Sequence, residues 1–399
     1  MRINSNKKIH KIKRDPYKTL LRTTGILAIV VVLGIGIFYL CSMAVTHDYT
    51  TQRDNLEKTN AEAEVEFNAK MNALKSNQNA TIDPDTGEIS EEDLPFWENT
   101  LEGKVWRIED EGSAGLENTG TISLNRADLV TGGMMLVNAW HSLPSDFSDS
   151  AMISVGETSN YKVQVKDASV KLYPVAYNAL LNIVTDAEAA GYKHYIVHAG
   201  YRTNAEQTEL FEAKMQKLSE KYTGETLIEQ TKKDVNYPGT SEYQTGLSFQ
   251  MGLYDKENTG EVDSKKGFQE SDQGIWFTDN CWKYGVVFRF PVADFPNSTW
   301  EDKSYKTAVS TKLNLYRYVG KAHSAAMRVM DYCLEEYVEF LMLHPHICIY
   351  EDGALKYEIV RIGMADSLDS FSLPVPNPAS DYQASIDNMG GIVMAYTYN

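Results

Sequence analysis

The sequence predicts an α+β fold, and three local patterns carry this prediction. Apolar and polar residues alternate from Leu247 to Met251, directly after a turn at Thr245-Gly246, which is the period of a half-buried strand. The apolar residues from Val175 to Ala190 recur at helical spacing, and the following Gly191 suits the end of a helix. Asp352-Gly353 separates two apolar runs, which is a β-hairpin signal.

Length and charge restrict the possible classes of protein. The chain has 399 residues with 43% hydrophobic content, enough for two or three domains with a sizeable core. Its net charge of −17 argues against a nucleic acid as partner.

The N-terminal residues predict a membrane anchor. Residues 1–24 form a basic tail with a net charge of +7, and the uncharged apolar run 25–45 is long enough to span a bilayer. The basic tail should stay in the cytoplasm, which places the acidic remainder outside the cell. The alternative is a cleaved signal peptide with Ser42-Met43-Ala44 at its cleavage site, although the apolar run is longer than such peptides use.

Three further segments follow the anchor. Residues 46–93 are polar with a weak helical pattern and predict a stalk. Residues 94–343 predict the main globular domain, and 344–399 a small β module. Cys281, Cys333 and Cys348 form no Cys-x-x-Cys motif, so we expect buried thiols, with a Cys333–Cys348 bridge as the alternative.

Arg202 is the first candidate binding residue. Tyr195 to Ala199 predicts a buried strand, and Thr203 with Glu206 predicts a capping box for a helix that runs to about Leu218. Arg202 therefore stands at the positive end of a helix, where an anionic ligand is favoured. The alternative is a surface arginine paired with a local acid.

The segment from Gly239 to Met251 is the second candidate region. It is a polar loop leading into the predicted strand, so that polar side chains could line one cleft, namely Ser241, Tyr243, Ser248 and Gln250. Downstream, the sequence predicts a helix up to Tyr284-Gly285 followed by a strand over 286–290, and then one long helix over 323–341.

Four segments, in order, carry a resemblance to a known family. They are the run Met135 to Phe147, Gly200-Tyr201-Arg202-Thr203, the Ser241-Glu242 and Gln244-Thr245-Gly246 matches, and Tyr284-Gly285 to Pro291 with Arg317-Tyr318-Val319-Gly320. The chain resembles the VanY-type D-alanyl-D-alanine carboxypeptidases, zinc peptidases that trim bacterial cell-wall stem peptides. The resemblance covers about residues 133–343 and implies helices around a small antiparallel sheet. It also implies that Arg202 holds the substrate carboxylate.

The sequence departs from this family at its chemical positions. Where the family has its zinc ligands, this chain has Tyr243, Gln250 and Leu315, and Lys312 stands in place of the general base. A catalytic zinc needs three ligands from His, Asp, Glu or Cys, so we expect no metal and no catalytic residue. His141, His198, His323, His344 and His346 are separate histidines of the kind that is usually structural.

The favoured hypothesis is an inactive, membrane-anchored relative that binds cell-wall stem peptide or a cell-envelope protein. Its expected binding residues are Arg202, Ser241, Gln244 and Lys312, with Lys312 supplying part of the missing positive charge. Alternatively, Lys312 points to solvent or pairs with Glu242. Two other functions stay open: an active carboxypeptidase with a non-standard site, and a purely structural scaffold.

Overall fold

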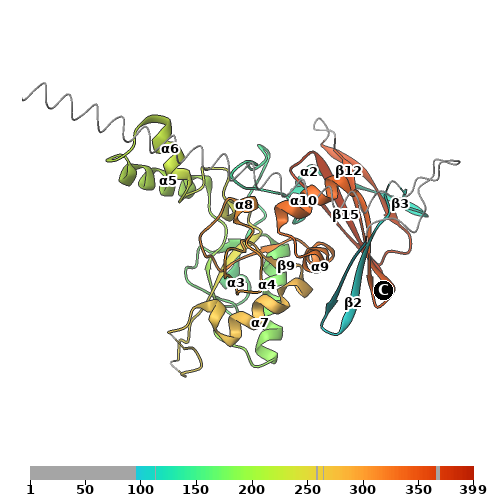
Figure 1. Cartoon of the computed structure of the whole chain (residues 1–399), viewed down its shortest axis with the longest axis horizontal. Helices are drawn as coiled ribbons and strands as arrows, with labels where there is room; N and C mark the ends of the chain where they lie inside the picture. The colour runs from blue at the N-terminus through green and yellow to red at the C-terminus, as the bar shows by residue number, and fades with distance from the viewer. Residues whose placement is uncertain (1–95, 113, 258, 264, 365–368) are drawn as a thin grey trace, which may run out of the picture. The chain divides into compact units, whose positions relative to one another are not determined.

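The computed structural model describes residues 96–399 apart from 113, 258, 264 and 365–368 (Figure 1). The basic tail, the anchor and the stalk predicted over 1–24, 25–45 and 46–93 lie outside these residues. Within the described part, no helix combines the length and apolar character needed to cross a membrane.

A five-stranded sheet carries the candidate site. Its order is β5 (Gln164–Val165), β7 (Tyr195–Ala199), β8 (Ser248–Leu253), β10 (Leu315–Tyr318) and β9 (Val286–Phe288). Only β5 and β7 pair in parallel; the other neighbours are antiparallel. Helices α4 (Pro174–Ala189) and α7 (Asp272–Asn280) contribute Leu180 and Phe277 to a buried apolar cluster that also holds Phe249 and Tyr316 of the sheet.

The local predictions for this region are largely confirmed. Helix α4 and strand β7 lie where their patterns placed them. Helix α5 (Asn204–Leu218) begins at Thr203, whose side chain exchanges hydrogen bonds with Glu206 in a capping box. The predicted helix and strand around Gly285 appear as α7, η4 (Cys281–Tyr284) and β9, with Gly285 in the left-handed conformation.

A six-stranded antiparallel sheet joins the two ends of the described chain. Its order is β1 (Phe96–Leu101), β2 (Lys104–Asp110), β11 (His346–Glu351), β12 (Ala354–Gly363), β15 (Gly391–Thr397) and β14 (Asp381–Ile386) (Figure 1). The hairpin expected at Asp352-Gly353 is confirmed between β11 and β12. The β module expected over 344–399, however, includes strands from before residue 126, because β2 pairs with β11 and β3 (Thr119–Asn125) pairs with β13 (Ser370–Pro376).

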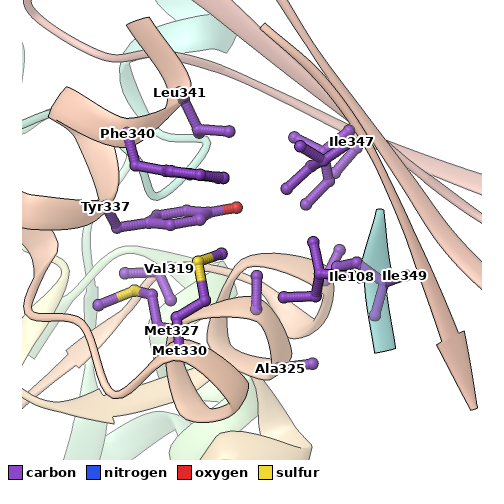
Figure 2. Packing of buried hydrophobic residues seen from close by; sticks show 14 of the residues in the cluster. Ile108, Val319, Ala325, Met327, Met330, Tyr337, Phe340, Leu341, Ile347 and Ile349 are labelled. Atoms are coloured by element: carbon purple, nitrogen blue, oxygen red, sulfur yellow. The ribbon is translucent and has the colours of Figure 1, made fainter. Parts of the chain in front are cut away.

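The single helix expected over 323–341 is wrong: two helices occupy this stretch. Helix α9 (Lys321–Met330) ends at Asp331, which takes a left-handed conformation with φ of 55°. Helix α10 (Leu334–Leu343) then starts at Cys333, whose backbone N–H donates to the Glu336 carboxylate. The break lets both helices pack on the six-stranded sheet (Figure 2).

Figure 2 shows this packing. Tyr337, Phe340 and Leu341 of α10 face Ile347 of β11, and Met330 of α9 belongs to the same cluster. Because side chains alternate along a strand, Ile347 and Ile349 point to the helices while His346 and Cys348 point to the other face.

The cysteine expectation is confirmed for the described residues: Cys281, Cys333 and Cys348 are free and buried. The alternative, a Cys333–Cys348 bridge, is wrong. The remaining short elements are α2 (Arg126–Val130), β4 (Ile153–Ser154), α3 (Val155–Thr158), β6 (Lys171–Leu172), α6 (Gly224–Lys232), η2 (Glu242–Gln244), η3 (Phe268–Glu270) and α8 (Ser304–Thr307).

Candidate functional site

The loop before β8 is fixed by its own side chains. Gly246 has a φ of +67°, as its turn required, and a Cβ there would overlap the side chain of Met152. Gln244 is buried; its Oε1 accepts from the Gly239 N–H at 2.7 Å, and its Nε2 donates to Asn204 Oδ1 at 3.1 Å. Gln244 therefore holds the loop against the start of α5 and has both ends of its amide engaged inside the protein.

The three positions of the expected zinc ligands lie together. The Tyr243 hydroxyl donates to Gln250 Oε1 at 3.1 Å. Leu315 on β10 is directly opposite Gln250 on β8, and its side chain is fully buried. The structure thus brings together three residues from two separate segments, which the resemblance had assigned to one site.

These three side chains do not fit a zinc ion. Burial raises the pKa of Tyr243, despite the opposing effect of the Arg202 charge, so the phenol stays protonated. Gln250 is a neutral amide already bonded to that phenol, and Leu315 offers no donor atom. A zinc site needs a set of His, Cys or carboxylate ligands, which is absent from this trio.

Arg202 lies beside the same trio. Its backbone N–H donates to the Tyr243 carbonyl at 2.9 Å, and its guanidinium carbon is 4.5 Å from the centroid of the Tyr243 ring. Its Nη1 donates to Gln207 Oε1 at 2.8 Å on α5. In the described part of the chain Arg202 forms no direct ion pair with a carboxylate, and the nearby acid Glu206 acts on it only through its charge. The alternative of direct pairing with a local acid is therefore wrong.

The other proposed binding residues are placed less favourably. Ser241 is buried, immediately before η2. Ser248 does not join Tyr243 and Gln250, because its hydroxyl donates to the buried Glu242 carboxylate at 2.6 Å. Lys312 is exposed, with its Nζ 5.9 Å from the Phe295 ring centroid. It points to solvent and does not pair with Glu242.

Glu242 instead belongs to a buried ion cluster that the sequence analysis missed. We call Glu242, Arg289, Arg317 and Glu335 the ion cluster; all four side chains are at most 4% exposed. Arg289 donates to Glu242 at 2.9 Å and, through its two Nη atoms, to Glu335 at 2.9 and 2.7 Å. Arg317 pairs with the other oxygen of Glu242.

The ion cluster joins distant parts of the fold. Arg317 also donates to the carbonyls of Gly133 and Met135, each at 2.8 Å. Burial would raise the pKa of Glu242, but the charges of Arg317 and Arg289 outweigh it and hold the pKa at about 2. Two cations and two anions balance one another, so the cluster stays charged inside the core.

A signal for the ion cluster was present in the sequence. Glu242, Arg289 and Arg317 each fall at a position where this chain keeps the residue of the family pattern. Residues of this chain that match the family pattern thus include three members of the ion cluster. Residues that differ from the pattern occupy the positions of the family's metal ligands.

Comparison with known proteins identifies the domain. Residues 169–320 match the family model described as "VanY: D-alanyl-D-alanine carboxypeptidase". The chain carries a VanY-family domain.

Individual relatives extend the likeness beyond the matched residues. The chain is 24% identical over 308 residues to a D-alanyl-D-alanine carboxypeptidase of Enterococcus faecium, covering 77% of this chain and 88% of that protein. It is 32% identical over 142 residues to the bifunctional D-Ala-D-Ala dipeptidase and carboxypeptidase VanXYC of Enterococcus gallinarum, covering 36% and 65%.

A solved structure shows the same fold. The D,D-dipeptidase VanXYg, crystallised with a D-Ala-D-Ala phosphinate analog, superposes with a TM-score of 0.52 at 22% identity, covering 70% of this chain and 99% of that one. The VanY-family domain thus has a carboxypeptidase-type fold of mixed helices and sheets.

In the part of the chain that the structure describes, no group of three His, Cys, Asp or Glu side chains that could hold an ion forms around Tyr243, Gln250 and Leu315. His323 is fully buried in α9, where its Nδ1 lies 3.1 Å from the Tyr337 hydroxyl, and His141 lies 2.9 Å from Asn138. Among the described residues, the group of three His, Cys, Asp or Glu side chains that could share an ion lies in the six-stranded sheet instead.

Proposed function

We propose that the VanY-family domain binds the free C-terminus of a peptidoglycan stem peptide and does not cleave it. The observation that carries the proposal is Arg202: a half-buried guanidinium with no carboxylate partner among the described residues, next to metal positions that lack metal ligands. The membrane anchor and the extracellular position remain part of the proposal, resting on residues 1–45.

The surroundings of Arg202 favour an anion. Burial lowers the pKa of Arg202, so its charged form is less stable here than in water. A bound carboxylate would offset this by forming charge-assisted hydrogen bonds, in a geometry that a guanidinium can match with two parallel N–H groups. Tyr243 and Gln207 hold the guanidinium in place, and the start of α5 adds a favourable dipole.

The same region lacks the groups that hydrolysis requires. A metallopeptidase activates a water molecule on its metal and removes a proton with a general base. The Tyr243–Gln250 pair and Leu315 do not supply the first function. Lys312, exposed and cationic, does not supply the second.

The choice of ligand rests on the relatives. Enzymes that resemble this chain are named for D-Ala-D-Ala peptides, and the fold neighbour was crystallised with an analog of that dipeptide. A domain that retains the fold and Arg202 is suited to the carboxylate end of such a peptide.

Calorimetry on the full-length chain tests the proposal. The ligands are stem-peptide fragments ending in D-Ala-D-Ala, compared with the same peptides amidated at the C-terminus. Removing the carboxylate charge should weaken binding by about 1.5–3 kcal/mol, or about ten- to 140-fold. Arg202→Ala should have a similar effect, and Arg202→Lys should lose part of the affinity because lysine lacks the bidentate fork.

Arg107→Ala is the matched control, because Arg107 lies on β2 of the other sheet, partly exposed and paired with Glu109. Its substitution should leave peptide affinity unchanged. Absence of binding at millimolar peptide, or equal binding of acid and amide, would favour the scaffold or protein-partner alternatives. Release of D-alanine would favour the active peptidase.

A further inference from the structure

A second group of polar side chains lies far from Arg202 in the chain, on the six-stranded sheet. His346 and Cys348 are two residues apart on β11, and Glu358 on β12 is directly opposite Cys348. One potential ligand atom from each, a ring nitrogen, a sulfur and a carboxylate oxygen, lie within 4.8 Å of one another. His346 and Cys348 are buried and Glu358 is half-buried.

The strand geometry explains why these three side chains meet. Ile347 and Ile349 point to helices α9 and α10 (Figure 2), so their neighbours in β11 project from the opposite face. The β11–β12 register then places Glu358 on that same face. No sequence motif marks this group, because its members come together across the β11–β12 hairpin.

We propose that His346, Cys348 and Glu358 form a binding site for a divalent transition metal such as zinc. Imidazole, thiolate and carboxylate are the donors that zinc takes, at about 2.0–2.3 Å, which places the ligand atoms of a tetrahedral ion about 3.3–3.8 Å apart. His346 Nε2 and Glu358 Oε1, 2.8 Å apart here, would separate by about 0.5–1 Å to admit the ion. Three protein ligands leave a fourth position for water or an additional side chain.

Hydrogen bonds already orient two of the ligands. His346 Nδ1 donates to the Ala114 carbonyl at 2.7 Å, which directs Nε2 toward Glu358 Oε1 at 2.8 Å. The Tyr398 hydroxyl donates to the other oxygen of Glu358. Backbone carbonyls on metal-bound histidines and donors to metal-bound carboxylates are typical outer partners of such sites.

The local charges favour a cation between these groups. With Nδ1 donating to Ala114, Nε2 and the carboxylate face each other as two acceptors unless a proton or a metal ion lies between them. A cation bound there would also stabilise the thiolate form of the buried Cys348.

The test uses the full-length chain and two metals. After dialysis against zinc with a competing chelator, the protein should hold about one zinc per chain by elemental analysis. Cobalt(II) should produce a thiolate-to-metal charge-transfer absorption, which reports a Cys ligand directly. Cys348→Ser should abolish this absorption, and His346→Ala should weaken metal binding at least tenfold. Tyr398→Phe should weaken it about tenfold, the lower range for an outer-partner change.

Cys281→Ser is the matched control, because Cys281 is an equally buried thiol in another part of the fold. It should keep both the zinc and the cobalt absorption. Circular dichroism and urea unfolding establish that each variant is folded before its metal content is compared. Absence of metal from the unsubstituted protein, or an absorption that survives Cys348→Ser in folded protein, would overturn the proposal.

Discussion

Glu242 and Tyr243 are neighbours in one short turn, yet they belong to two regions that differ in charge. Glu242 enters the ion cluster, with Arg289 and Arg317 bonded to its two oxygens. Tyr243 joins the neutral trio with Gln250 and Leu315, where the metal ligands of the family are expected. In the resemblance to VanY-type enzymes, Glu242, Arg289 and Arg317 fall on matching positions, whereas Tyr243, Gln250 and Leu315 fall on positions that differ.

The difference teaches that the fold and the chemistry of this domain depend on separate residues. Removing one member of a buried ion cluster leaves an uncompensated charge in the core, which strongly destabilises a protein. Replacing metal ligands by a phenol, an amide and a leucine leaves no charge without a partner, since the phenol and amide bond to each other. The second kind of change is therefore compatible with a stable domain.

The largest expected effect is in the ion cluster. Arg289→Leu removes the cation shared by Glu242 and Glu335, and should lower the free energy of unfolding by about 3–5 kcal/mol. Urea unfolding of the full-length chain measures this, with Arg107→Ala as an exposed control expected to lose at most about 1 kcal/mol. A loss below about 1 kcal/mol for Arg289→Leu would remove the structural role assigned to the ion cluster.

The pH dependence of stability should show the same cluster. The pKa of Glu242 is about 2 in the folded protein, below its usual value of 4.5. Its stabilisation is therefore present above pH 4.5 and is lost as the pH falls toward 2, in total about 3 kcal/mol. Urea unfolding at several pH values measures this. Between pH 4.5 and 2, the free energy of unfolding should fall less steeply with pH for Glu242→Gln than for the unsubstituted chain. Equal slopes for the two proteins would show that Glu242 does not carry the effect.

The neutral trio should respond least. Tyr243→Phe removes the hydrogen bond to Gln250 but keeps the ring under Arg202, so the loss of stability should be about 1 kcal/mol. Peptide affinity should be unchanged within error, because the carboxylate contact is assigned to Arg202. A loss of stability as large as that of Arg289→Leu would show that the trio stabilises the fold as strongly as the ion cluster does, which contradicts the difference between the two regions.

Local physics made part of this structure predictable from sequence. The capping box of Thr203 and Glu206, the hairpin at Asp352-Gly353 and the helix over 174–189 depend on residues near one another in the chain. The pairing of β2 with β11 joins residues that are more than 230 positions apart in the chain. Alternation of apolar and polar residues predicts a strand but does not predict which other strand it pairs with. The break at Asp331 likewise arises from packing of two helices on a sheet that the sequence did not reveal.

The candidate site divides in the same way. The positions of Tyr243, Gln250 and Leu315 were predicted from the resemblance to VanY-type enzymes, and the structure brings them together. The ion cluster was missed because charged residues are expected at the surface unless a partner is known, and Glu242 and Glu335 lie 47 and 46 residues from Arg289. Lys312 was assigned to the binding site from the resemblance alone. Its side chain is exposed to solvent, with its Nζ near the Phe295 ring.

A measurement of D-alanine release tests the central claim most directly. The full-length chain, supplied with zinc, is incubated with a stem peptide ending in D-Ala-D-Ala at a concentration that calorimetry shows to be saturating. The carboxypeptidase of Enterococcus faecium, 24% identical to this chain, serves as the parallel enzyme sample. The account predicts bound peptide and no D-alanine above the protein-free blank. Sustained release by this chain that disappears with Arg202→Ala would contradict it, and would show that a non-standard site performs the cleavage.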